Sequence, residues 1–245
     1  MHGYAEHSGR YLHAAEYLVR SGYAVYAFDL AGHGRSEGKR AFVWSFDEYL
    51  VDVEQTLSRA RERAAGKRFF LLGHSLGGAI AALFAIEKRP GLAGLILSGP
   101  YLKLTGDIPP LRLKLALIFG TILPNLPVAK KIDSSLLSRD PVVAERYDKD
   151  PLVYHGMMKA REAAEIIRAV KRIQAEMEAV TLPLLILHGS GDRLADIEGS
   201  KEFYRGAGST DKTLKIYEGL YHEVLNEPEK ERVLADIAAW LDAHV

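Results

Sequence analysis

The sequence predicts an α/β protein whose mostly parallel sheet is flanked by helices and interrupted by one helical insertion. Three observations lead to this fold class. Short, uninterrupted apolar runs alternate with longer segments of helical periodicity. The runs lack the alternation of apolar and polar residues that a half-exposed sheet shows, so both faces of the strands should be buried. About eighty residues near the middle of the chain break the pattern and contain no convincing strand.

Five apolar runs have the length of a typical strand. They occupy residues 23–28, 68–72, 92–97, 182–187 and 213–217. Because helical segments separate them, the strands should lie parallel in a sheet that is covered on both faces.

The ends of the helices are visible in the sequence. Residues 45–65 begin with Ser45-Phe46-Asp47-Glu48, which is a capping box, and stop at Gly66. Three further helices are expected at residues 11–20, 76–88 and 228–243.

The central segment differs from both flanks. The first part of residues 100–181 carries Pro109, Pro110, Pro124 and Pro127 among many leucines, and residues 157–180 show one long amphipathic helical pattern. We interpret residues 100–181 as a helical cap inserted into a core formed by residues 1–99 and 182–245. A separate helical domain is the alternative.

Composition excludes several classes of protein. The chain of 245 residues carries 32 Lys and Arg against 32 Asp and Glu, so it lacks the basic excess of a nucleic-acid-binding protein. It has no cysteine, which excludes thiol nucleophiles, thiolate metal sites and disulfides and fits a cytoplasmic location. The longest apolar stretch, residues 111–128, is interrupted by charges and prolines and is not a transmembrane helix.

The strongest chemical signal is Gly73-His74-Ser75-Leu76-Gly77, which matches the G-x-S-x-G pattern. It lies between a predicted strand and a predicted helix, where a sharp turn would expose the serine hydroxyl above the sheet. The alternative is a glycine-rich turn whose serine only caps the helix. The strand and helix on either side favour Ser75 as a nucleophile.

A serine nucleophile needs a base and an acid, which in this arrangement follow it in the order acid, then histidine. His222 lies in a loop between the last strand and the last helix, whereas we expect His188 to be structural and His244 to lie in a fraying terminus. Asp192 follows the strand at 182–187 on a glycine-containing turn, and Asp196 is its competitor. We predict a triad of Ser75, His222 and Asp192.

Two backbone N–H groups are expected to stabilise an oxyanion. Leu76 opens the helix after the serine, and Tyr4 follows His2-Gly3 in a loop near the N-terminus. A plain N-terminal turn is the alternative for Tyr4. The loop Gly32-His33-Gly34 lacks the spacing of a phosphate-binding loop, so we interpret it as structural.

Together these segments resemble the α/β-hydrolases of the monoacylglycerol lipase type, a group also described as lysophospholipases or serine aminopeptidase-like hydrolases. The string Glu6-His7-Ser8-Gly9-Arg10-Tyr11 separates this group from most other α/β-hydrolases. The other matching segments are residues 2–5, 29–36, 73–78, 123–127, 137–141, 188–192 and 221–223. The resemblance covers nearly the whole chain. It implies an α/β-hydrolase fold, hydrolysis of the single ester of a monoacylglycerol, and neither a cofactor nor a metal.

The cap should contact the lipid part of the substrate. We expect the acyl chain to lie against Leu111, Leu115, Ile118, Phe119 and Ile122, and part of this face to contact membranes or micelles.

A general carboxylesterase and a lysophospholipase stay open as alternative functions. The leucine-rich cap favours a long acyl chain, and nothing basic in it marks a phosphate head group. An epoxide hydrolase would need Asp in place of Ser75, and a member that only binds ligands would not need the triad. Oligomeric state stays open.

The start of the chain departs from the family pattern. Family members carry two to three strands before the His-Gly loop, whereas here Met1 directly precedes His2. No segment is left to fill the sheet between the predicted strands 23–28 and 68–72. We therefore expect the N-terminal strands to be missing, as after an internal start or in a gene fragment, unless these two strands pair directly or another segment fills the gap. Because open strand edges promote aggregation, the chain should be poorly soluble or inactive alone, and an upstream segment of about 20 to 30 residues should restore both properties.

Overall fold

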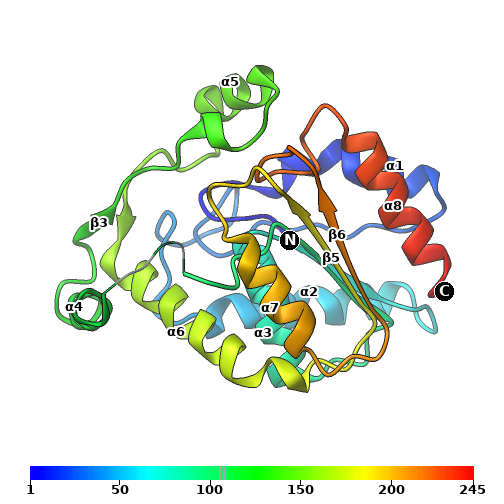
Figure 1. Cartoon of the computed structure of the whole chain (residues 1–245), viewed down its shortest axis with the longest axis horizontal. Coiled ribbons are helices and arrows are strands. Elements are labelled where there is room, and N and C mark those ends of the chain that lie inside the picture. The colour runs from blue at the N-terminus through cyan, green and yellow to red at the C-terminus, as the bar shows by residue number, and fades with distance from the viewer. Residues whose placement is uncertain (105, 107–108) are drawn as a thin grey trace.

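A computed structural model describes residues 1–104, 106 and 109–245 (Figure 1). Its main sheet is parallel, as predicted, with the strand order β1-β2-β5-β6. The strands are β1 (Phe70–His74), β2 (Gly94–Ser98), β5 (Leu184–Gly189) and β6 (Lys212–Tyr217). All residues of β2 and β5 are buried, which explains their continuous apolar sequences.

The two faces of the sheet support two separate hydrophobic cores. Leu95 and Leu97 of β2 point into one core, and Ile96 between them points into the other. The first core is completed by α2 (Asp47–Arg63), α3 (Leu76–Lys88) and α7 (Ile197–Gly206), together with one helix from the inserted segment. The second is covered by α1 (Leu12–Arg20) and α8 (Lys230–Asp242) (Figure 1).

The inserted segment contains more than helices. It comprises α4 (Pro110–Ile122), β3 (Pro127–Ala129), η2 (Ser134–Leu136), α5 (Pro141–Lys149), β4 (Met158–Lys159), α6 (Ala160–Glu176) and η3 (Met177–Ala179). The expectation of no strand here was wrong, because β3 and β4 form a short antiparallel pair. Prolines and the brevity of these strands hide them from a search for apolar runs.

Helix α6 joins the insertion to the core. Glu162 accepts hydrogen bonds from the Val43 N–H (3.0 Å) and the Tyr49 hydroxyl (3.0 Å), and Glu165 accepts one from the Phe46 N–H (3.1 Å). Burial raises the pKa of Glu162 to about 7. On the outer side of α6, Gly120 of α4 approaches so closely that an added Cβ would lie 2.4 Å from the Ala164 Cβ. Helix α6 therefore packs on the core, and α4 packs on the outer side of α6.

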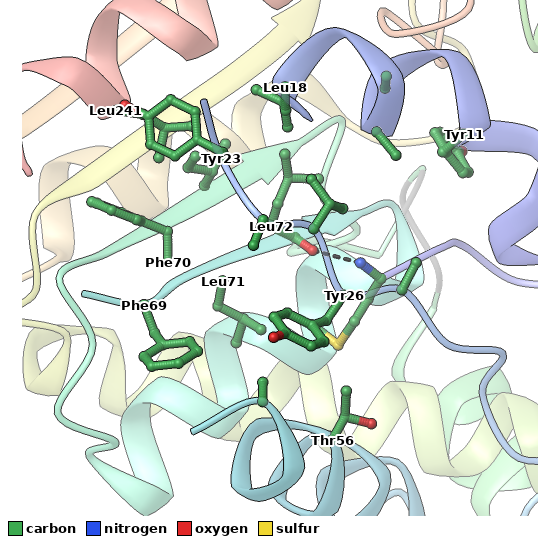
Figure 2. A pocket seen from close by; sticks show the side chains of 18 of the residues that line it. Tyr11, Leu18, Tyr23, Tyr26, Thr56, Phe69, Phe70, Leu71, Leu72 and Leu241 are labelled. Atoms are coloured by element: carbon green, nitrogen blue, oxygen red, sulfur yellow. Dashed lines mark hydrogen bonds between the residues drawn. The ribbon is translucent and has the colours of Figure 1, made fainter. Parts of the chain in front are cut away.

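The predicted strand at residues 23–28 is not a strand. The segment has no regular secondary structure, and Val25 and Tyr26 are 38% and 39% exposed. It does not pair with β1, which is the edge of the sheet. Instead, an apolar groove of about 880 Å³ separates the two, lined by Tyr23, Tyr26, Phe69 and Leu72 among others (Figure 2). An apolar run becomes a strand only if a neighbour accepts its backbone hydrogen bonds, and no strand of the described residues pairs with this segment.

None of the described helices is long and apolar enough to cross a membrane.

Candidate active site

The turn between β1 and α3 holds Ser75 in a strained backbone conformation. Its φ of 53° and ψ of −117° are unusual for a residue with a side chain. Glycines make the turn possible: an added Cβ on Gly73 would lie 2.2 Å from the Gly77 carbonyl oxygen. The Ser75 N–H donates to the Ser98 carbonyl oxygen at the end of β2 (3.0 Å). The side chain is thereby presented, half-buried, at the carboxyl end of the sheet.

Two predicted oxyanion donors lie beside this serine. Leu76 opens α3, and the first N–H groups of a helix have no acceptor within it. The loop with Tyr4 reaches Ser75 through Gly3, where an added Cβ would lie 3.0 Å from the Ser75 Cβ. The Gly3 N–H is held by Glu6 Oε1 (2.5 Å), which fixes the loop. Leu76 therefore follows the serine directly, and Gly3, the residue before Tyr4, borders its side chain.

Asp192 and His222 form a hydrogen-bonded pair. Asp192 Oδ2 lies 2.7 Å from His222 Nδ1, and both side chains are buried. The other carboxylate oxygen accepts hydrogen bonds from the backbone N–H groups of Leu194 (2.8 Å) and Ala195 (3.0 Å). His188 Nε2 is 3.0 Å from Asp192 Oδ2, but its direction falls short of a hydrogen bond. The loop after β5 thus fixes the Asp192 carboxylate. The carboxylate then orients the His222 imidazole through its Nδ1 atom.

Gly99 shows how close this pair lies to the serine turn. An added Cβ on Gly99 would lie 2.8 Å from the His222 carbonyl oxygen and 3.6 Å from Asp192 Oδ2. Gly99 directly follows Ser98, whose carbonyl oxygen accepts from the Ser75 N–H. No hydrogen bond joins the Ser75 hydroxyl to His222 among the described residues. Such bonds are often long in free enzymes and tighten when substrate binds.

The charges of the pair support an imidazole base. Burial raises the pKa of Asp192, but the charge and hydrogen bond of His222, together with the adjacent His188, reverse this and hold the pKa well below its usual range. Burial lowers the pKa of His222, but Asp192 outweighs it, so the net shift is upward from 6.5. Asp192 is therefore ionised at neutral pH, and His222 is a stronger base than free histidine.

The competing residues have other roles. Asp196 caps α7 by accepting from the Glu198 N–H (2.9 Å). His188 Nδ1 lies 2.8 Å from the Ser200 hydroxyl in the buried core. His244 stacks on Trp240 and contacts Asp211 (2.9 Å), so it is held rather than frayed.

The chain is similar in sequence to a known hydrolase family and to several lipases. Residues 1–229 match the family described as serine aminopeptidase, S33. The chain belongs to this hydrolase family. It is 37% identical over 244 residues to the monoacylglycerol lipase of Mycolicibacterium smegmatis, and the matched region covers 100% of this chain and 87% of that protein. It is 39% identical over 243 residues to the monoglyceride lipase of Homo sapiens, with 98% and 80% covered.

Solved structures agree with this assignment. The monoacylglycerol lipase of Paleococcus ferrophilus superimposes with a TM-score of 0.90 at 33% identity, covering 100% of this chain and 93% of that one. The predicted resemblance and the α/β-hydrolase fold are confirmed, and the chain is a carboxylic ester hydrolase.

This S33 hydrolase also contains a buried ion-pair network that sequence reasoning did not identify. The Arg10 guanidinium donates to Glu6 Oε2 (2.5 Å) and, through both terminal nitrogens, to the two carboxylate oxygens of Glu223 (2.6 and 2.8 Å). Glu6 holds the Gly3 loop, and Glu223 directly follows His222. Arg10 therefore connects the oxyanion loop to the histidine loop. The only sequence signal was the string at residues 6–11, which was noted as a family marker without a role.

Ligating atoms of Glu6, His74 and Glu223 lie within 4.8 Å of one another, a spacing that could suit a cation. The guanidinium of Arg10 forms ion pairs with both carboxylates and already occupies the space beside them. Burial lowers the pKa of His74 to about 3, so its imidazole is neutral and adds no charge to the cluster. We therefore interpret these residues as a structural network.

The insertion contacts both loops of the site. The Tyr154 N–H donates to the Ala5 carbonyl oxygen (2.8 Å), and the Glu223 N–H donates to the Leu137 carbonyl oxygen (2.8 Å). Arg10 also lies 4.9 Å from the ring centre of Tyr147 on α5. Movement of the cap would therefore displace the loop at residues 3–6 and the loop that carries His222.

The two aspartates near the site give the first prediction. Asp192→Asn should lower kcat by about 10³- to 10⁴-fold, because the amide no longer favours the required imidazole tautomer or stabilises its cation. Asp196→Asn should change kcat less than about threefold, since asparagine also caps helices. Steady-state hydrolysis of a p-nitrophenyl ester measures both. A larger loss for Asp196→Asn would show that the acid has been misassigned.

The second prediction concerns pH. Because Asp192 raises the pKa of His222, kcat/KM should fall on acidification with a midpoint above 6.5, about tenfold for each further pH unit. The decline reflects protonation of the imidazole, which must be neutral to accept a proton. A pH series of kcat/KM in buffers of constant ionic strength tests this. A profile that stays flat down to about pH 4 would exclude a histidine base.

Proposed function

We propose that the chain hydrolyses the carboxylic ester of monoacylglycerols through a Ser75-His222-Asp192 triad and an acyl-enzyme intermediate. The observation that carries this proposal is the buried Asp192–His222 hydrogen bond of 2.7 Å beside the strained Ser75 turn. A serine in this turn, next to a histidine that is both oriented and made more basic, is suited to nucleophilic catalysis.

The reaction would proceed in two halves. His222 Nε2 accepts the proton of the Ser75 hydroxyl as its oxygen attacks the ester carbonyl carbon. The backbone N–H groups of Tyr4 and Leu76 stabilise the resulting oxyanion. When the tetrahedral intermediate collapses, the C–O bond to glycerol breaks, and His222 returns the proton to the leaving oxygen. A water molecule, deprotonated by His222, then attacks the acyl-enzyme and releases the fatty acid together with free Ser75.

The substrate class rests on relatives and on the cap. The relatives at 37% and 39% identity are named monoacylglycerol or monoglyceride lipases. Phospholipase and caffeoylshikimate esterase relatives at 32% identity keep the lysophospholipase and general carboxylesterase alternatives open. The apolar cap favours a long acyl chain over a short one.

The outer face of α4 supports contact with lipid. Leu111 is 67% exposed and Ile122 is 63% exposed, and Leu115 and Ile118 also face solvent, whereas Phe119 is half-buried. The opposite face of α4 packs on α6 through Gly120. A helix with one packed face and one exposed apolar face can rest on a lipid aggregate. We therefore propose that α4 contacts membranes or micelles from the cytoplasmic side, and that its apolar residues receive the acyl chain as it leaves the lipid.

The third prediction tests the reaction. The protein should release fatty acid from 1-monooleoylglycerol with a higher kcat/KM than from dioleoylglycerol or lysophosphatidylcholine. Ser75→Ala should lower kcat about 10⁶-fold and abolish labelling by a fluorophosphonate probe. Titrated fatty-acid release and gel fluorescence measure these outcomes. Faster turnover of lysophosphatidylcholine would favour the lysophospholipase alternative, and labelling of Ser75→Ala would place the nucleophile elsewhere.

The fourth prediction tests the cap. Replacing Leu115 and Phe119 with Ser should reduce kcat/KM for twelve-carbon esters far more than for two-carbon esters. Each lost methylene contact is worth up to roughly 0.8 kcal/mol, so the deficit should grow with chain length. Val51→Ser is the matched control, because Val51 is 46% exposed on α2, outside the insertion. Equal losses for both esters would show that α4 does not contact the acyl chain.

A further inference from the structure

Three basic residues gather where the insertion meets the core. Lys39 and Arg40 lie in the loop before α2, and Lys159 belongs to β4. The ammonium groups of Lys39 and Lys159 are 4.2 and 5.8 Å from the ring centre of Phe42. The Lys159 ammonium also donates to the Arg40 carbonyl oxygen (3.4 Å), across 119 residues of sequence. We call these three residues the cation cluster, which only the fold assembles.

The acidic residues around the cation cluster have other partners. Among the described residues, no aspartate or glutamate forms an ion pair with a member of the cluster. Glu48 of α2 accepts from the Trp44 N–H (2.8 Å). Glu165 of α6 pairs with Arg161 (3.2 Å) and Arg168. The positive charge of the cluster is therefore available to a partner outside the chain.

The pKa of Lys159 reflects this crowding of like charges. Burial and the adjacent charge of Lys39 lower the pKa, and the buried Glu162 acts in the opposite direction without reversing the shift. Like charges held close together disfavour each other's charged form. An anionic partner would relieve that repulsion.

The cation cluster adjoins the exposed apolar face of α4. Four exposed residues of this helix recur at intervals of three and four and therefore share one face: Leu111, Leu115, Ile118 and Ile122. Asn125, three residues beyond the last of them, accepts a hydrogen bond from the Lys39 ammonium. Figure 1 shows α4 and β3 on the side of the molecule farthest from α8. The cations thus stand at one end of an apolar stripe.

The surface around the stripe is basic and includes an exposed tryptophan. Residues 109–132 carry four basic side chains and no acidic one. Two of them, Lys130 and Lys131, are exposed directly after β3, which pairs with β4. Trp44 is 59% exposed, and its ring meets the Phe42 ring edge-on (5.0 Å between centres). Tryptophan and basic residues beside an exposed apolar helix are typical of proteins that rest on a lipid surface.

Other anionic partners fit this surface less well. A free phosphate would contact the cations and leave the apolar stripe uncovered, and so would a nucleic acid. The chain also carries equal numbers of basic and acidic residues, 32 of each, and lacks the overall basic excess of a nucleic-acid-binding protein. A membrane meets both features at once, since its head groups carry the anions and its acyl chains receive the stripe.

We propose that the cation cluster, together with Lys130 and Lys131, docks the protein on membranes rich in anionic phospholipids. The proposal rests on the lipid contact of α4 under the proposed function and adds the charge of the lipid that is recognised. Head-group phosphates lie at the level of Lys39 and Lys159, while Leu115 enters the acyl region. Electrostatic attraction brings the protein to the surface, and the apolar stripe holds it there.

The experiment measures sedimentation of the 245-residue chain with two kinds of vesicle. One contains only phosphatidylcholine, and the other contains phosphatidylcholine and phosphatidylglycerol in equal parts. Three double variants are compared with the unsubstituted chain: Lys39→Gln with Lys159→Gln, Lys39→Arg with Lys159→Arg, and the control Arg20→Gln with Lys67→Gln. Both control residues are exposed, at the end of α1 and before β1, and form no ion pair among the described residues. Unchanged unfolding midpoints establish that the variants are folded.

A lysine beside an anionic surface contributes about fivefold to binding, so the double glutamine variant should bind the phosphatidylglycerol vesicles about 25-fold more weakly. The double arginine variant and the control should stay within about twofold of the unsubstituted chain, because charge at the two positions is kept. All four proteins should bind pure phosphatidylcholine alike. Added NaCl should bring the unsubstituted chain close to the glutamine variant, since salt screens exposed charges.

Equal losses in the glutamine and arginine variants, or in the glutamine variant and the control, would overturn the proposal, because charge at these two positions would then not decide binding. Release of the protein by inorganic phosphate at constant ionic strength would also overturn it, by indicating a discrete phosphate site. Leu115→Ser tests the contact of α4 separately and should weaken binding to both kinds of vesicle. The cation cluster is assessed from the difference between the two vesicles and without turnover, so failure of catalysis or of the α4 contact is distinguishable from its failure.

Discussion

The backbone conformation of Ser75 is the constraint on which the rest of the site depends. Its positive φ places the side chain above the sheet while the chain reverses from β1 into α3. The reversal requires Gly73 and Gly77, because an added Cβ at either would collide with backbone; at Gly77 it would lie 2.4 Å from the His2 carbonyl oxygen. The same close approach brings the loop at residues 2–4 against the serine. One packing arrangement therefore positions Ser75 and the loop beside it, and the strain is offset by the sheet and by the buried helix α3 that precede and follow the turn.

A second constraint is electrostatic. Glu6 and Glu223 are buried carboxylates on different loops, and Arg10 forms an ion pair with each of them. Removing one partner from a buried ion pair typically costs 3–5 kcal/mol, because the remaining charge is left without compensation. Because separating the loop of Glu6 from the loop of Glu223 would break these ion pairs, this cost holds the two loops at a fixed distance. The insertion adds to this restraint by hydrogen bonding to Ala5 and Glu223, so the cap and the catalytic loops form one connected unit.

The site is supported by the sheet on one side and by side-chain contacts on the other. β1, β2 and β5 are joined by continuous ladders, and Ser75, Gly99 and Asp192 follow their carboxyl ends. The loop at residues 2–5 meets the end of β1 through Met1 and is held further by Glu6 and by the hydrogen bond from the Tyr154 N–H to the Ala5 carbonyl oxygen.

The sequence by itself determined the parallel α/β architecture and the loops after the strands that carry Ser75, Asp192 and His222. These features follow mainly from local chemistry, because helix caps and glycines at a sharp turn act within a few residues of the chain. The tertiary structure alone decided that Arg10 joins the loops of Glu6 and Glu223, and that β3 pairs with β4. It also decided that residues 23–28 form no strand. Each of these outcomes depends on a partner distant in sequence, and periodicity reports which face of a segment is apolar but not whether a neighbour is present to receive its hydrogen bonds.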